Sequence, residues 1–446
     1  MKCTTWSSSA GAAQCKQSKV HAQSQAQNQG AAYLSSQRAG GNERGLRAPG
    51  LGGMASRLLH RLACPSYDLC WLSLEPEAQG EKAAVAELVL VAGGGGTGNT
   101  GVKNQIQVAK YVGNGDFDFL PEYCLDRFCS GLCQGRLGGL VVVCALLEMQ
   151  CLVLSVSQAT TGVGVLFKRL FEFTADFSEK DASLNSVIVA QNDVLVTGGE
   201  DGVVRVWNVT TAADPTAFSV SKSRDCKGHK GPIMALAKHP SKPWVCSASK
   251  DGSCKIWSLD STELLSDIPC IDAASGISSS ASMKFQCRGC VFSKDGSNLY
   301  SIQCGARGVT HLIQFSLEII PDEKKVKSVA VKTVIANKDP STRLVLSDGN
   351  LLAVGCSNGF VSVFRADETL TKVIAKSCHD DYPVTGIAFS SSSAAKNENS
   401  DCFFVTCSAD NRMASVVVRR SKLLLLAIFL LVVFLLWAIS WQQKNK

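Results

Sequence analysis

The sequence lacks any concentrated stripe of basic residues. Its 446 residues include 45 Lys and Arg against 38 Asp and Glu, and this net charge of +7 is spread along the chain without a run of one sign. A nucleic-acid-binding surface needs clustered cations, because its affinity comes mainly from local contacts with phosphates. The sequence therefore predicts no nucleic-acid partner.

The 20 cysteines lack the spacing of a structural zinc site. Cys287 and Cys290 form one C-x-x-C pair, but such a site takes four ligands and needs a second pair, which the sequence does not show. The other cysteines are scattered, as expected for small buried hydrophobic residues in a reducing compartment. No zinc centre is predicted.

Residues 1–53 have little apolar periodicity and are rich in Ser, Ala, Gln and Gly. They also lack the apolar core of a signal peptide. We expect 1–53 to be a disordered low-complexity extension. The hydrophobic share of the whole chain, 46%, is nevertheless large enough to bury a sizeable core elsewhere.

Residues 423–441 read LLLLAIFLLVVFLLWAISW and contain no charge. As a helix they would span about 28 Å, which suits a thin bilayer such as that of the endoplasmic reticulum. A buried core helix is the alternative, and it is disfavoured because globular helices rarely need to be apolar all round. The sequence predicts a transmembrane helix over 423–441.

The basic residues near this span indicate its orientation. Four precede it and two follow it, namely Arg412, Arg419, Arg420 and Lys422 before, and Lys444 and Lys446 after. The positive-inside rule then places the preceding chain in the cytosol and 442–446 in the lumen as a short tail. The arrangement resembles that of tail-anchored proteins.

A second apolar run covers residues 137–156. Glu148 lies inside it, and a carboxylate at the centre of a bilayer costs about 2.5 to 3.5 kcal/mol. We expect two buried β-strands here; a second membrane span is the alternative.

From about residue 66 to 419, short β-branched runs alternate with turn signals, and helical periodicity is weak. Four segments repeat a strand, an Asp- or Asn-containing turn and a second strand. The turn residues are separated by 50, 107 and 52 positions; they are Asp201, Asp251, Asn358 and Asp410. A degraded unit fits between the middle pair at 285–317, and two more fit upstream at 67–112 and 140–173.

Seven such units predict an all-β, seven-bladed β-propeller over residues 64–420. A shorter period of about 40 to 45 residues would allow eight blades, but the observed spacing favours seven. The pattern Gly228-His229, Asp251 and Trp257 resembles the WD-repeat family. That resemblance implies a buried hydrogen-bonded chain of histidine, hydroxyl and aspartate ending near the tryptophan.

An eleven-residue glycine-rich segment, GGGGTGNTGVK, separates two expected strands at 87–92 and 104–112. Its glycines satisfy the spacing of a dinucleotide fingerprint and of the start of a Walker loop. Both motifs need a helix immediately afterwards, whereas a strand follows here, and Val102 stands where the Walker lysine belongs. Direct nucleotide binding is therefore not predicted.

The glycine-rich segment can instead present oxygen atoms to a ligand. Successive glycines allow positive φ values and can turn carbonyl groups towards one point. Thr97, Asn99, Thr100 and Asn104 add uncharged oxygen atoms. These features suit a monovalent cation or a closely docked partner. An exposed hairpin tip without function is the alternative.

The glycine segment in the first blade, the seven units and the C-terminal span together resemble one WD-repeat family over residues 64–441. It comprises the endoplasmic-reticulum exchange factors for the small GTPase of the COPII coat, including the prolactin regulatory element-binding protein. The resemblance implies that the segment binds potassium and reaches into the GTPase. The residues carried over are Gly93, Gly94, Gly95, Gly96, Thr100, Gly101 and Asn104 for the GTPase, and Gly94, Gly95, Gly96 and Thr100 for potassium.

The chain departs from that family in lacking the long lumenal domain of some members and in its apolar second unit. The resemblance implies a guanine-nucleotide exchange factor in the endoplasmic-reticulum membrane, which performs no covalent chemistry. His60, His239, His311 and His379 are isolated in sequence and are predicted to be structural. One alternative is a non-catalytic membrane-anchored escort or scaffold for cargo exit, as in plant phosphate-transporter traffic facilitators. A transcriptional regulator is a further alternative, which is disfavoured.

Overall fold

The structure is a computed structural model that describes residues 55–75, 85–96, 100–159, 164–191, 193–211, 218–270, 285–305, 308–320, 325–390 and 400–419. All of them belong to the unit Gly52–Lys446. The predicted extension (1–53), membrane span (423–441) and lumenal tail (442–446) lie outside the described residues. Within the described part, no helix is long and apolar enough to cross a bilayer.

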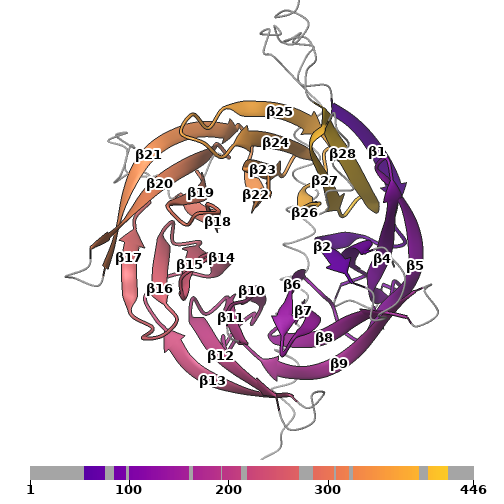
Figure 1. Cartoon of the computed structure of the whole chain (residues 1–446), viewed down its shortest axis with the longest axis horizontal. Coiled ribbons are helices and arrows are strands. Elements are labelled where there is room, and N and C mark those ends of the chain that lie inside the picture. Colours follow the sequence, from indigo (N-terminus) through magenta and orange to yellow (C-terminus); the bar gives the residue numbers. More distant parts are fainter. Residues whose placement is uncertain are drawn as a thin grey trace, which may run out of the picture. The chain divides into compact units, whose positions relative to one another are not determined.

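Seven four-stranded antiparallel sheets are arranged in a ring (Figure 1). Blade 1 comprises β2 (Ser66–Leu74), β3 (Ala86–Gly93), β4 (Asn104–Gly113) and β5 (Asp116–Leu125). Blade 2 comprises β6 (Gly131–Leu137), β7 (Leu140–Leu147), β8 (Gln150–Gln158) and β9 (Val165–Thr174). Blade 3 comprises β10 (Leu184–Val189), β11 (Val194–Gly199), β12 (Val204–Thr211) and β13 (Phe218–Cys226).

The remaining blades follow the same order from the centre outwards. Blade 4 comprises β14 (Ile233–Lys238), β15 (Trp244–Ser249), β16 (Cys254–Ser258) and β17 (Leu264–Ile268). Blade 5 comprises β18 (Gln286–Phe292), β19 (Asn298–Cys304), β20 (Thr310–Ile320) and β21 (Lys325–Asn337). Blade 6 comprises β22 (Ser341–Leu346), β23 (Leu351–Cys356), β24 (Phe360–Arg365) and β25 (Lys372–Ser377). The predicted seven-bladed propeller is confirmed.

Blade 7 is completed by a strand from the other end of the chain. Its inner strands are β26 (Val384–Phe389), β27 (Ser400–Ser408) and β28 (Arg412–Arg419), and its outer strand is β1 (Ala55–Arg61). The predicted start of the propeller at residue 64 is therefore too late. β1 reads ASRLLHR and has no β-branched or aromatic residue, so its strand character comes from pairing with the exposed edge of β28.

Apolar side chains fill the space between every pair of neighbouring blades. The seven hydrophobic clusters of the described residues correspond one to one to the seven blade interfaces, including the closure between blades 7 and 1. Each blade is thus covered on both faces by its neighbours, so near-continuous apolar strands are expected in the middle of a blade.

The apolar run at 137–156 illustrates this burial. It forms β7 and β8, as predicted, and Leu147 and Gln150 pair across a two-residue turn. Glu148 occupies that turn with a φ of 52° and reaches solvent at the edge of the blade. The strand interpretation of this run is confirmed.

The two faces of the ring carry different strand connections. Within a blade the strands alternate in direction, so the connection between the second and third strands lies at one end and the other two connections lie at the opposite end. We call the first end the loop face, because it carries the β3–β4 connection. The opposite face carries the connections β14–β15 and β16–β17 of blade 4 and their equivalents.

Candidate functional site

The glycine segment connects β3 to β4 on the loop face, and its backbone requires glycine at several positions. Gly94, Gly96 and Gly101 have φ values of 151°, 78° and 76°. A Cβ on Gly94 would collide with Asn104 Oδ1, and a Cβ on Gly95 would collide with Thr100 Oγ1. The glycines therefore serve close packing of the loop upon itself as well as positive φ values.

Three successive carbonyl groups of this loop are each held by a side chain. Tyr67 Oη donates to the carbonyl oxygen of Gly94 at 3.3 Å, and Thr100 Oγ1 donates to that of Gly95 at 3.3 Å. Asn104 Nδ2 donates to that of Gly96 at 3.2 Å. The loop base is thus an ordered structure with oriented carbonyl groups.

Gly93 anchors the loop at its start. It is the last residue of β3, and a Cβ there would lie 2.6 Å from the carbonyl oxygen of Pro65. The same Pro65 oxygen accepts a hydrogen bond from the amide of Gly94 at 2.9 Å. The predicted residues Gly93 to Gly96, Thr100 and Asn104 are therefore brought together, and Gly101 lies beside them at an exposed turn.

Asn104 Oδ1 is a buried acceptor without a hydrogen-bond partner among the described residues. A buried amide oxygen left unpaired costs about 1 to 3 kcal/mol, so such an atom usually has a ligand or water. Each carbonyl oxygen has a second lone pair beyond the hydrogen bond that it already accepts. These donors are uncharged oxygen atoms, and the set contains no thiolate or imidazole, the ligands that zinc prefers.

Tyr67 is a site residue that the sequence analysis did not identify. It lies in β2 at a β-bulge between Ser66 and Asp68, which re-aims its side chain towards the loop. Its ring packs edge-on against Phe128 with centroids 4.7 Å apart, and burial raises the pKa of its hydroxyl. Residues 97–99, including the predicted oxygen donors Thr97 and Asn99, lie outside the described residues.

The polar chain that the WD resemblance implied is present in blade 4. Trp257 Nε1 donates to Ser247 Oγ at 2.8 Å, and Ser247 Oγ lies 2.7 Å from His229 Nε2. His229 Nδ1 lies 3.1 Å from Asp251 Oδ2. The tautomer that satisfies all three contacts carries its proton on Nδ1, so Ser247 donates to Nε2 and His229 donates to the carboxylate.

Burial alone would raise the pKa of Asp251. Hydrogen bonds from His229, the amide of Lys230 and Ser253 outweigh burial and hold that pKa well below its ordinary value. Asp251 is therefore an ionised structural anchor, not a catalytic acid.

A second cluster of this kind occurs in blade 7. His379 Nδ1 lies 2.9 Å from Asp410 Oδ2, and His379 Nε2 lies 3.0 Å from Thr406 Oγ1. His239 accepts backbone hydrogen bonds in a turn, His60 contacts Gly115, and His311 packs against Phe285. The prediction that these four histidines are structural is consistent with their surroundings.

The sequence analysis found no second cysteine pair for zinc, but the fold brings one close. Cys246 and Cys254 of blade 4 face Cys287 and Cys290 of blade 5, and the sulfurs of Cys254 and Cys287 are 3.1 Å apart. Burial is the main reason that the pKa of Cys246 is raised well above its ordinary value. No group of three or more metal-binding side chains in the described part is arranged to hold a metal ion.

Comparisons with known proteins find the same repeat. The WD domain, G-beta repeat, matches residues 171–208 and 220–258. Each match begins in or beside the outer strand of one blade and ends with the third strand of the next blade, so the sequence repeat is offset from the blade by one strand. The offset explains why β1 must complete blade 7.

Curated relatives align over short segments. Ribosome biogenesis protein ytm1 of Aspergillus oryzae is 30% identical over 82 residues, which is 18% of this chain and 17% of that protein. Autophagic-related protein 16.2 of Caenorhabditis elegans is 33% identical over 90 residues, 20% of this chain and 16% of that protein. The chain thus aligns with less than a fifth of the length of either relative.

Among solved structures, Chaetomium thermophilum Sqt1 bound to the N-terminus of the ribosomal protein L10 has a TM-score of 0.51 at 16% identity. The match covers 77% of this chain and 82% of that one, and at this identity it shows the fold alone. The protein is a seven-bladed β-propeller that contains WD repeats at residues 171–208 and 220–258. Propellers of this class generally serve as scaffolds for protein interactions.

Proposed function

We propose that this protein is a guanine-nucleotide exchange factor for the small GTPase of the COPII coat, anchored in the endoplasmic-reticulum membrane. The observation that carries the proposal is the β3–β4 loop, whose carbonyl groups at Gly94, Gly95 and Gly96 are held by Tyr67, Thr100 and Asn104. A loop of this length is unnecessary for joining two strands, since hairpin loops usually take two to five residues.

Ordering before binding favours tight association, because less conformational entropy is lost when the partner docks. The loop also presents side chains to solvent: Val102 is 42% exposed, and Thr100 and Lys103 are exposed. An exposed apolar residue beside fixed carbonyl groups suits insertion into a partner. We therefore assign the β3–β4 loop, and not the other connections of the loop face, to the contact with the GTPase.

Exchange needs no covalent step. A factor that binds the nucleotide-free GTPase more tightly than the nucleotide-bound form raises the rate of GDP release, and excess GTP then refills the site by mass action. Potassium, if bound, would be held by the carbonyl oxygens of Gly94 to Gly96 with Asn104 Oδ1, and it would add positive charge to the loop. A membrane anchor at 423–441 would confine the activated GTPase to the bilayer that it coats.

The test is fluorescence-followed GDP release from the COPII GTPase, with the purified full chain in mild detergent. Asn104→Ala removes the donor to Gly96 and the unpaired Oδ1, so we expect stimulated release to fall tenfold or more, equivalent to about 1.4 kcal/mol. Replacing potassium by sodium or lithium should also lower the rate, because smaller ions fit the same cage poorly.

Asn358→Ala is the matched control, because Asn358 occupies the equivalent connection of blade 6 on the same face. It should cost stability through its lost contact with Asp339 and leave GDP release unchanged. If Asn104→Ala folds normally and releases GDP at the wild-type rate, the exchange proposal is wrong. The non-catalytic escort for cargo exit is then the better description.

Membrane topology can be tested separately in intact microsomes. An N-terminal tag should be digested by added protease, whereas a short C-terminal glycosylation tag should be modified. A protected N-terminal tag together with an unmodified C-terminal tag would contradict the proposed orientation.

A further inference from the structure

Two cavities lie next to each other on the face opposite the glycine loop. The first has a volume of about 260 Å³ and lies between blades 3 and 4. The second has a volume of about 370 Å³ and is lined by the ends of the inner strands of blades 1 to 4. They share Ala190 and Lys238, so the two cavities adjoin and we treat them as one groove. We call it the basic groove.

Four cationic side chains and one acidic side chain line the basic groove. They are Arg136, Lys238, Lys242 and Arg224, against Asp260. Arg136 also forms an ion pair with Glu75, which lies beside the groove, at 4.0 Å. The only histidine in the lining, His239, has a pKa lowered chiefly by burial and so adds no charge near neutrality. Because the chain as a whole carries only +7 over 446 residues, this concentration of cations is local.

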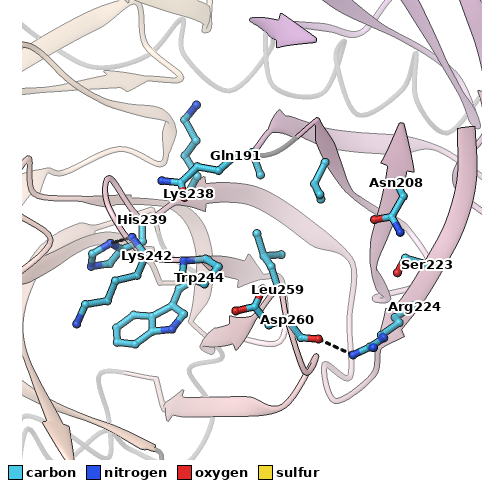
Figure 2. Close-up of a pocket in the computed structure, with 13 residues that line it drawn as sticks. Gln191, Asn208, Ser223, Arg224, Lys238, His239, Lys242, Trp244, Leu259 and Asp260 are labelled. Carbon is cyan, nitrogen blue, oxygen red and sulfur yellow. Dashed lines mark hydrogen bonds between the residues drawn. The ribbon is translucent and has the colours of Figure 1, made fainter. Parts of the chain in front are cut away.

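The cations are positioned but retain donors. Lys238 Nζ donates to the carbonyl oxygen of Val189 at 3.0 Å, and Arg224 Nη1 donates to the carbonyl oxygen of Asp260 at 2.6 Å (Figure 2). Lys242 Nζ lies 4.4 Å from the centroid of the Trp244 ring. An ammonium has three donors and a guanidinium five, so each group can still bind a carboxylate.

We infer that the basic groove binds an extended acidic segment of a partner protein. Carboxylates spaced along an extended chain can reach Arg136 in the second cavity, Lys238 where the cavities join, and Arg224 in the first cavity. Figure 2 shows Lys238, Lys242 and Arg224 distributed around the lining, with the Trp244 ring beside Lys242. The aromatic ring and the stem of Lys242 offer an apolar wall between the charged positions.

Arg136, Lys238 and Arg224 are exposed to solvent, so a chain in extended conformation can reach all three without a change in the fold. The N-terminal extension of this chain cannot supply the ligand, because residues 1–53 contain one acid, Glu43, among several basic residues. The occupant that we infer is a separate chain. This inference does not depend on exchange activity, since the groove and the glycine loop lie on opposite faces.

The test measures anisotropy of a fluorescein-labelled decaglutamate peptide with the full chain in mild detergent. We expect saturable binding that weakens as salt rises from 50 to 200 mM, since the contacts are ionic. Lys238→Gln combined with Lys242→Gln should weaken binding at least tenfold. The matched control is Lys327→Gln with Lys332→Gln, which removes the same charge from the exposed strand β21 and should change the affinity less than twofold.

Melting curves check that both double variants remain folded, and Arg136→Gln provides an independent variant at the other end of the groove. Equal losses in the groove and control variants would overturn the inference, because general charge would then explain binding. Absence of saturable binding to the wild-type chain would also overturn it. Binding of phosphatidylserine in mixed micelles, without binding of the peptide, would overturn it in favour of a lipid surface.

Discussion

The β3–β4 connection of blade 1 and the β15–β16 connection of blade 4 occupy the same place in their blades but have opposite tasks. In blade 4, Asp251 of the short connection is hydrogen-bonded to His229 and thereby to Ser247 in the strand behind. In blade 1 the connection contains no acid. Its described residues form hydrogen bonds within the loop, with Asn104 at the start of β4, and with Tyr67 and Pro65. One connection holds its blade together, and the other is available for a partner.

Blade 1 can do without this polar anchor because of its neighbours. Two large apolar clusters cover its two sides, one shared with blade 2 and one shared with blade 7. The second of these includes Trp71, Phe117 and Phe403, whose rings contact one another across the closure of the ring. Aromatic burial thus stabilises the blade that carries the long loop.

Of the variants that distinguish the two connections, Asp251→Ala should have the largest effect on stability. The substitution leaves His229 Nδ1, the Lys230 amide and Ser253 without their acceptor, so we expect a loss of about 3 kcal/mol in the free energy of unfolding. Denaturant titration measures it, and His229→Ala should be strongly non-additive with it. GDP release at saturating partner should be unchanged in the folded protein. A loss below about 1 kcal/mol would show that the connection of blade 4 is not an anchor.

The second prediction addresses the loop of blade 1. Gly95 does not need a positive φ, but a Cβ there would collide with Thr100 Oγ1 and lie 2.8 Å from the carbonyl oxygen of Val102. Gly95→Ala should therefore displace Thr100 and reduce stimulated GDP release about tenfold, or about 1.4 kcal/mol. Because the loop is at the surface, the denaturation midpoint should hardly move. A large fall in stability with normal release would reverse the roles that we give to the two connections.

The propeller could be predicted because several of its repeats have an Asp or Asn at the same position. Asp201, Asp251, Asn358 and Asp410 all occupy the connection between the second and third strands of a blade, as their spacing indicated. Strand β1 could not be predicted, since ASRLLHR has no strand pattern of its own and is determined by the free edge of β28. Local pattern thus predicts blades, whereas ring closure is a tertiary effect.

The candidate site was predicted only where its residues are close in sequence. The glycines, Thr100 and Asn104 belong to one segment and were found together. Tyr67 comes from another strand, and a bulge directs it to the loop. The basic groove was missed for the same reason, because its cations come from three blades and are diluted along the sequence.

Acid should weaken the polar anchor of blade 7 and leave the loop of blade 1 unaffected. The pKa of His379 is lowered, chiefly by burial, even though Asp410 opposes the shift. A histidine whose folded pKa lies below its unfolded value of about 6.5 stabilises the fold above that pH, and this contribution is lost as the pH falls below it. Lowering the pH from 7.5 to 5.5 should therefore reduce the free energy of unfolding by about 1 kcal/mol through His379.

His379→Asn should remove that part of the pH dependence, measured as the difference between denaturant titrations at the two pH values. Asn104→Ala should retain the full wild-type pH dependence, since the loop contains no group that titrates in this range. If His379→Asn and the wild type lose equal stability between pH 7.5 and 5.5, burial of this histidine is not what makes blade 7 sensitive to acid.

The smallest expected effect belongs to Tyr67→Phe. The phenyl ring keeps the edge contact with Phe128, and only the 3.3 Å hydrogen bond to the carbonyl oxygen of Gly94 is lost. A hydrogen bond of this kind contributes about 0.5 to 1 kcal/mol, so stimulated GDP release should fall about two- to fivefold. The carbonyl of Gly94 is then held by neither Thr100 nor Asn104, which hold its neighbours. Tyr67→Ala should lower stimulated GDP release further, because it also removes the ring. If the hydroxyl acts only on stability, Tyr67→Phe and the wild type should stimulate release equally under conditions in which both are fully folded, and this outcome would contradict the prediction.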